Sequence, residues 1–495
     1  MTGAWAGIMP EGAVALELKL PAAATRRVAR VLGLKGRRGR ACAFSWHDGP
    51  DFAALAAGLA LVRCESGEKR GRWRVFGLRR WIGAPGEPRS EAGEPELIAE
   101  DLSRELLARL RPVATFAGTW RGLCGEAEGL APGVVIEVLT GRISADGRET
   151  ACGRVRLAGP AASVAAAARR LAEALPVEAA GRALAEEALA LAGAPELPEA
   201  PGRAGASVGE SFLRLLASLA AEMVLLASGI DLQDEEPVHR MRVAARRLRS
   251  ALSLFRRAAK GAELEKVGRE LGELGALLAP AREWDVFLGT IGAELVTARP
   301  DDPGVARLLA AAERRRRKVY EGLTAYLAGP RFRTLGVDLA LLVACRPWER
   351  EEGAARGRLD APVGDFARHV LARRFRPLMA AARGGGKGEV ARWPAGELHA
   401  LRLKGKRMRY AAEFFAPLFP GAATRRMLRR LAELQEALGR LNDGAGSAAL
   451  LGELGLAEGY GGGLVAGFVA ADAVRARAAI AHAWRRVHAA EAFWR

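Results

Sequence analysis

The sequence predicts two regions of different fold class: an α+β region with an antiparallel sheet over residues 1–195, and an all-helical region over residues 210–495. Three observations support this division. Short alternating runs of apolar and polar residues mark the first region, whereas helical periodicity continues almost unbroken through the second. Between them, residues 196–209 combine prolines and glycines in the manner of a linker.

The first region contains short segments with the two-residue period of strands. Alternation predicts strands near residues 15–20, 71–76, 134–138 and 153–157. Apolar residues at helical spacing predict helices near 21–33, 97–110, 161–175 and 178–192. Short strands with turns between them are typical of an antiparallel sheet.

The second region is predicted to be helical throughout. Pro237 follows three acidic residues, Asp234 to Glu236, and this pattern indicates the start of a helix, because acids favour a helix N-terminus and proline fits its first turn. The predicted helices lie near 210–228, 237–258, 262–279, 284–297, 303–328, 331–343, 364–383, 396–416, 423–440, 443–455 and 463–493.

An internal repeat occupies two of these helices. The pattern of Val238–Arg249 returns in Leu398–Arg409, with a histidine followed by cations at +3, +7, +8 and +10. At roughly 100° per residue, positions 0, +3, +7 and +10 fall within an arc of about 80°. We call these two sets the first ridge (His239, Arg242, Arg246, Arg249) and the second ridge (His399, Arg402, Lys406, Arg409).

Both ridges point to an anionic ligand. Like charges at i, i+3 and i+4 destabilise a helix unless an anion neutralises them. The formal charge of +18 is also uneven: residues 1–200 hold 27 Lys and Arg against 24 Asp and Glu, and the remainder hold 48 against 33. The helical region is therefore predicted to face a polyanion.

The same segments resemble the CHAD family, the conserved histidine α-helical domain. The resemblance rests on VHRMRVAARRLRSALSLF, LLAPAREWDV, LHALRLKGKRMRYAAEFFAPLF and LQEALGRLND, and extends from near Glu210 to the C-terminus. It implies two four-helix bundles related by a pseudo-twofold axis, with repeats at 210–343 and 364–495, and inorganic polyphosphate in a basic groove between them. The implied binding residues are His239, Arg242, Arg246, Arg247, Arg249, Arg282, His399, Arg402, Lys406, Arg407, Arg409 and Tyr410.

The first region resembles the CYTH family of triphosphate tunnel metalloenzymes. The family signature Glu-x-Glu-x-Lys stands here as Ala15-Leu16-Glu17-Leu18-Lys19, without its first glutamate, and its aromatic-Asp-Thr segment as Ser45–Asp51. Where the family has alternating glutamates for a metal, this chain has Gly153-Arg154-Val155-Arg156. Glu17 and Glu137 alone are too few ligands for Mg²⁺ or Mn²⁺. The resemblance therefore implies a degenerate tunnel that is inactive or nearly so.

Three function classes remain open. We expect a polyphosphate-binding protein that is not an enzyme; the alternatives are a residual metal-dependent triphosphatase and a basic nucleic-acid-associated protein. Aromatic residues make up 6% of the chain, and few lie beside the basic stripes, which disfavours single-strand nucleic-acid binding. His239 and His399 are interpreted as donors to phosphate rather than metal ligands, because their neighbours are arginines. The cation run from Arg314 to Lys318 is interpreted as mainly an exposed helix face.

Cofactors and cellular context are predicted from absences in the sequence. Five scattered cysteines form no CxxC pair, so neither a zinc site nor a disulfide framework is expected. No uncharged apolar run is long enough to span a membrane, and the first residues lack the features of a signal peptide. We expect a cytoplasmic protein with no cofactor, no metal, no membrane contact and no specific nucleic-acid partner. Association with polyphosphate granules is a further option.

Overall fold

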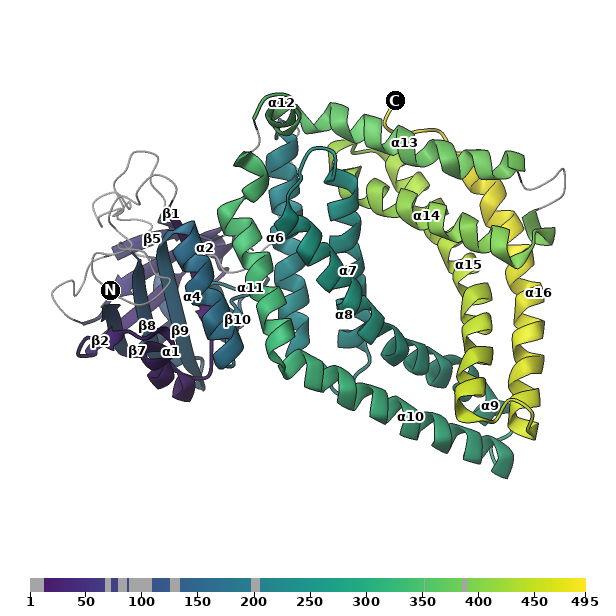
Figure 1. The fold of residues 1–495 in the computed structure, drawn as a ribbon, viewed down its shortest axis with the longest axis horizontal. Helices are drawn as coiled ribbons and strands as arrows, with labels where there is room; N and C mark the ends of the chain where they lie inside the picture. Colours follow the sequence, from purple (N-terminus) through teal and green to yellow (C-terminus); the bar gives the residue numbers. More distant parts are fainter. Residues whose placement is uncertain are drawn as a thin grey trace.

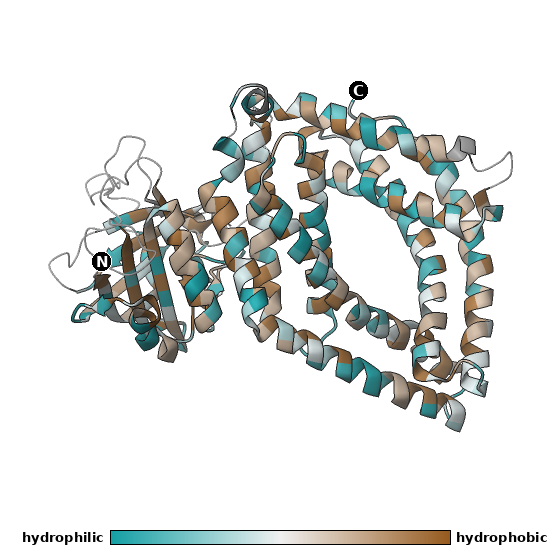
Figure 2. Cartoon of the chain, viewed as in Figure 1, coloured by the Kyte–Doolittle hydropathy of each residue, from teal (hydrophilic) through white to brown (hydrophobic). Residues whose placement is uncertain are grey.

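The computed structural model describes residues 13–66, 73–78, 87–88, 109–124, 134–196, 205–350, 352–384 and 390–495. An antiparallel sheet comes first in the chain and an all-helical region follows, as the sequence predicts (Figure 1). The helices of the second region are arranged around a frame in which α10 and α13 occupy opposite sides (Figure 1). Hydropathy changes every few residues along these helices, as expected when each helix buries only one face (Figure 2).

All strand pairs described in the sheet are antiparallel. The order is β10-β1-β9-β8-β7-β3-β4-β5-β6, with β2 paired to β7. Within the described residues this path has two ends, so the pairings seen there do not close a tunnel. The strands are β1 (Ala13–Lys19), β2 (Lys35–Gly36), β3 (Arg40–Asp48), β4 (Leu59–Cys64), β5 (Trp73–Gly77), β6 (Glu87–Pro88), β7 (Arg111–Cys124), β8 (Val135–Ala145), β9 (Arg148–Pro160) and β10 (Glu178–Ala179).

Helices cover both faces of the sheet. α4 (Ala161–Ala174) packs on the face that carries Leu16, Leu18 and Val155. α5 (Leu184–Leu191) covers the opposite face, where Phe44 and Phe116 stack at 4.8 Å. A short 3₁₀ segment, η1 (Ala22–Arg27), leads into α1 (Val28–Leu32), and α2 (Ala53–Ala56) follows β3.

The four predicted strands are all present, in β1, β5, β8 and β9, but β3, β4 and β7 were not predicted. In β7 the alternation is weak because small residues such as Ala114 and Gly118 occupy it. The helix predicted over 178–192 starts later, because Ala179 pairs with Leu18 as part of β10. Residues 97–108 of the helix predicted near 97–110 lie outside the described residues.

The helical region consists of long helices joined by short connections. None of the described helices is long and apolar enough to cross a membrane. The helices are α6 (Val208–Ala227), α7 (Glu236–Phe255), α8 (Ala262–Phe287), α9 (Ala293–Ala298), α10 (Pro303–Ala328), α11 (Pro330–Cys345), α12 (Ala354–Asp360), α13 (Val363–Gly384), α14 (Ala395–Phe415), α15 (Ala422–Leu454) and α16 (Tyr460–His488), with the π turn η3 (Leu288–Gly292) and the 3₁₀ turns η4 (Pro347–Arg350), η5 (Val390–Arg392) and η6 (Ala416–Leu418).

Helix boundaries recur at the spacing of the sequence repeat. α8 begins at Ala262 and α15 at Ala422, while α10 ends at Ala328 and α16 at His488, and both pairs share the offset that separates the two ridges. The ends of the two repeat helices also meet, because the rings of Phe255 and its counterpart Phe415 lie 6.1 Å apart. This contact brings α7 and α14 together.

Two predicted helix breaks were wrong. α8 runs through Pro280, because Leu278, Ala281 and Trp284 remain buried on both sides of the proline. α15 runs through Leu441 and Asn442, where the sequence predicts a break. Gly444 lies at a close approach of α16, and a Cβ there would lie 3.0 Å from Val469. Tertiary packing thus overrides the local tendency of these residues to end a helix.

The sheet and the helical region share one core. α11 packs against α4, β1 and β10, and the largest apolar cluster extends from Leu16 in the sheet to Leu339 in α11. Asp338, almost completely buried, binds Arg169 of α4 at 2.8 Å and Lys266 of α8 at 2.6 Å. A single carboxylate therefore ties the sheet region to two helices.

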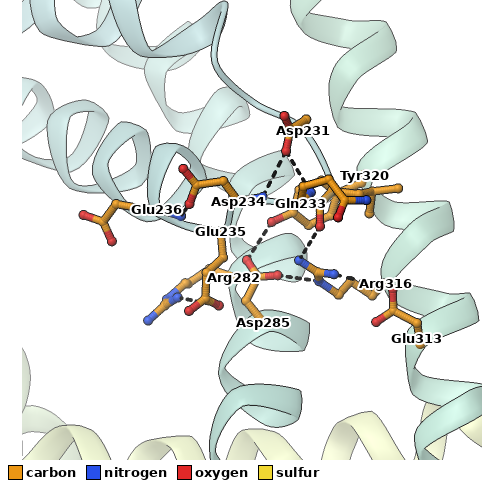
Figure 3. A network of polar contacts seen from close by, with 11 residues as sticks. Asp231, Gln233, Asp234, Glu235, Glu236, Arg282, Asp285, Glu313, Arg316 and Tyr320 are labelled. Carbon is orange, nitrogen blue, oxygen red and sulfur yellow. Dashed lines mark hydrogen bonds and ion pairs between the residues drawn. The ribbon is translucent and has the colours of Figure 1, made fainter.

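A second buried carboxylate fixes the segment that leads into α7 (Figure 3). Asp285 accepts hydrogen bonds from Arg316 at 2.7 Å and from the Tyr320 hydroxyl at 2.9 Å. Arg316 also donates to the carbonyl of Leu232, in the loop before α7, at 3.2 Å. In the predicted cation run, Arg316 is therefore a structural residue that links α8 and α10 to the start of the first ridge.

We expect Asp285→Ala to lower the stability of the helical region by about 3 kcal/mol, because Arg316 would be left largely buried without its closer counter-ion, while Glu313 at 3.5 Å would remain. Urea unfolding followed by circular dichroism measures this loss. Glu453→Ala is the matched control, since the Arg315–Glu453 pair is exposed, and its removal is expected to cost less than about 1 kcal/mol. Equal losses in the two variants would contradict a structural role for Asp285.

Candidate anion-binding site

Four cations from the two ridges converge between α7 and α14. The pKa of Lys406 is lowered to about 7, mainly by burial and then by the charges of Arg402, Arg246 and Arg242. Burial also lowers the pKa of Arg242, and the charges of Arg246 and Arg402 add to this shift. We call Arg242, Arg246, Arg402 and Lys406 the central cluster. Burial and mutual repulsion within this cluster together favour loss of a proton from its only lysine.

Two buried nitrogen atoms of the central cluster have no hydrogen-bond acceptor in the part of the chain that the structure describes. The Nε atoms of Arg246 and Arg402 are buried and make no hydrogen bond. The Arg246 guanidinium lies over the ring of Tyr410, 5.5 Å from its centroid, and Tyr410 itself is buried. Because a buried donor without a partner costs free energy, these atoms indicate a place for an external acceptor.

Two carboxylates border the cluster at repeat-related positions. Burial raises the pKa of Glu283, and burial raises that of Asp443, while in each case nearby arginine charges oppose the shift. Glu283 and Asp443 occupy equivalent positions in the internal repeat, so each repeat supplies one. Two carboxylates against four cations leave the centre positively charged. The sequence did not predict this role for either carboxylate.

His239 and Arg282 lie next to the central cluster. Burial lowers the pKa of His239, followed by the charges of Arg282 and, to a smaller degree, Arg246 and Arg242. The imidazole is therefore biased toward its neutral form. Arg282 pairs with Glu235 at 3.4 Å (Figure 3).

The other predicted binding residues are dispersed. Arg249 packs on α8, with its guanidinium 3.9 Å from where a Cβ on Gly272 would lie. Arg409 pairs with Glu413 on its own helix at 2.6 Å. Arg247 lies over the ring of Phe414, at 5.5 Å. His399 is exposed, and Arg407 is exposed near Arg374 of α13.

Comparison with known proteins identifies the helical region. The model of a family described as "CHAD domain" matches residues 213–452. These residues form a CHAD domain. A crystal structure of the CHAD domain from the plant Ricinus communis is 28% identical, covers 60% of this chain and 96% of that one, and has a TM-score of 0.49. PptA from Streptomyces chartreusis is 20% identical, with coverages of 57% and 100% and a TM-score of 0.43. No curated protein matches the chain.

The sheet region holds the second candidate site, around Glu17. This carboxylate is completely buried between Arg154 at 3.1 Å and Arg156 at 2.7 Å. Arg154 also pairs with Glu187 of α5 at 2.6 Å, and Lys19 binds the same glutamate at 2.9 Å. Among the described residues, no group of three or more His, Cys, Asp or Glu side chains could hold a metal ion. Glu17 is thus neutralised by arginines of the neighbouring strand β9.

We expect no enzyme-like release of phosphate from tripolyphosphate with Mg²⁺ or Mn²⁺, because the Glu17 oxygens already bind guanidinium groups. Colorimetric phosphate release from the full chain measures this. The Glu17→Gln variant serves as the reference. Metal-dependent turnover that Glu17→Gln abolishes would show that the carboxylate is available to a metal after all.

Proposed function

We propose that the CHAD domain of this protein binds inorganic polyphosphate, with the chain lying across the central cluster between α7 and α14. The observation that supports the proposal most directly is the convergence of Arg242 and Arg246 from one repeat with Arg402 and Lys406 from the other. Guanidinium groups bind phosphate oxygens in a fork, and each repeat supplies at least one. The resemblance to the CHAD family implies the same ligand.

The chemistry of the site favours phosphate chains over nucleic acid. Single-stranded nucleic acids need aromatic faces on which bases stack. Tyr410, the aromatic residue beside the central cluster, is buried and its ring is covered by Arg246. A polyphosphate has no bases and needs only cations, which is what the cluster offers. We infer that the protein binds polyphosphate in the cytoplasm and does not act as a catalyst. Association with polyphosphate granules is a further option.

Charge reversal on either helix should weaken binding of long-chain polyphosphate. We expect Arg242→Glu with Arg246→Glu to reduce the affinity for polyphosphate at least about a hundredfold, since two charge-assisted contacts are lost and the new carboxylates repel the anion. Arg402→Glu with Lys406→Glu should have a similar effect, because both helices line one site. Isothermal titration calorimetry of the full-length variants at one stated salt concentration provides the comparison.

A matched control is Arg425→Glu with Arg426→Glu, which changes the same charge at two exposed positions of α15. Its affinity should change far less. A single-site model shared by the repeats is wrong if one ridge variant abolishes binding and the other behaves like the control. Equal affinity of wild type for a short RNA of the same charge would favour the nucleic-acid alternative.

Lys406 should make polyphosphate binding pH-dependent. Its pKa of about 7 in the free protein should rise when a bound anion stabilises the ammonium, so binding takes up a proton. Affinity is therefore expected to increase as pH falls through 7 and to level off below the free-state pKa. Titrations at several pH values, compared with Lys406→Arg, measure this dependence.

Lys406→Arg keeps the positive charge over this whole range, so its affinity should vary less with pH than that of wild type. Protonation of the ligand is the same for both proteins and cancels in the comparison. Identical pH profiles would mean that Lys406 is charged throughout, or that the anion does not contact it.

A further inference from the structure

A second group of cations lies where α7 ends beside α13. Arg256 and Arg257 follow the last residue of α7, Arg373 and Arg374 belong to α13, and Arg407 belongs to α14. Burial lowers the pKa of Arg374, as do the charges of Arg373, Arg407 and Arg256. The pKa of Arg373 is lowered by burial and then by Arg257 and Arg256. We call these five residues the outer cluster.

Among the residues that the structure describes, no carboxylate pairs with the outer cluster. Within the described residues, none of its five guanidinium groups forms an ion pair with an acidic side chain, in contrast to Arg282, Arg316 and Arg409. The Arg374 Nε atom is buried and makes no hydrogen bond, and another nitrogen of the same group donates to the Ser253 hydroxyl at 3.3 Å. Whereas Glu283 and Asp443 border the central cluster, the outer cluster is uncompensated.

The outer cluster also departs from the internal repeat. At the offset of the repeat, Arg256 and Arg257 correspond to Ala416 and Pro417, and Arg373 corresponds to Leu213. Only Arg374 and Arg407 have basic counterparts, in Arg214 and Arg247. The other end of the pseudo-symmetric arrangement therefore lacks an equivalent group, so the repeat pattern alone does not explain this accumulation of charge.

Arg407 directly follows Lys406 of the central cluster on α14, so the distance between the far members of the two clusters decides which ligands can span both. About four helical turns separate Arg242 from Arg256, which directly follows α7, and this corresponds to about 20 Å along the helix axis. A tripolyphosphate is too short to contact Arg242 and Arg256 at once. A long polyphosphate can, and its second contact is then effectively intramolecular.

We propose that the outer cluster is a second phosphate-binding site that holds one end of a long polyphosphate chain whose other part lies on the central cluster. The inference rests on the proposed function and deepens it. It makes the domain selective for chain length, and because the repeat-related positions lack an equivalent cluster, it places the extended part of the ligand on one side of the pseudo-twofold axis.

The test uses Arg256→Gln with Arg257→Gln in the full-length protein, since both side chains are exposed and their removal leaves no buried group unpaired. Affinities for tripolyphosphate and for long-chain polyphosphate are measured by calorimetry under the same salt conditions. We expect long-chain affinity to fall about tenfold, as for loss of one or two charge-assisted contacts, with tripolyphosphate affinity changed less than about twofold. The salt dependence of long-chain binding should also become shallower.

Arg314→Gln with Arg317→Gln is the matched control. It removes the same charge at exposed positions of α10, on the opposite side of the frame from α13 (Figure 1). The inference is overturned if the outer-cluster variant binds long chains with the same affinity as this control. It is also overturned if the affinity of the variant for tripolyphosphate falls as much as its affinity for long chains. Either result leaves the proposed function intact, whereas failure of the wild type to bind either ligand would overturn the proposed function and, with it, this inference.

Discussion

Repulsion among Arg242, Arg246, Arg402 and Lys406 is the constraint on which the arrangement of the helical region depends. Partly buried like charges repel more strongly than exposed ones, because water screens them less. The helices that carry them are held by apolar contacts on their other faces, where Met241, Leu248, Leu401 and Met408 are fully buried. The core thus holds together charges that would otherwise move apart, and an anion is the simplest source of relief.

The sequence was a good guide to the fold of the helical region and a partial guide to its site. Periodicity and the repeat predict which residues share a helix face, since this depends only on the geometry of one helix. They do not predict which members of a ridge meet the other helix, since this depends on how α7 and α14 approach. Arg249 lies on the same arc as Arg246, yet it packs on α8. The arginines of α13 were missed because no motif marks them.

In the sheet region, the sequence singled out Glu17, Arg154 and Arg156 but did not show that they form one buried network. The Glu17 network includes Glu187, which lies in α5, far from Glu17 in the chain. Neither alternation nor a signature connects two such positions. The structure shows that two arginines on β9 supply the positive charge that stabilises this buried carboxylate.

The core shared by the sheet and the helices bears on how the protein can be divided. α11 presents Leu335, Leu339 and Val343 as fully buried side chains, and α4 and the edge of the sheet lie against this helix. Cutting the chain before α6 would uncover this face and leave Asp338 without Arg169. A fragment of the helical region alone would carry an apolar patch and a weakened ion pair, and poor solubility is the expected result. The sheet region thus covers an apolar face of the helical region.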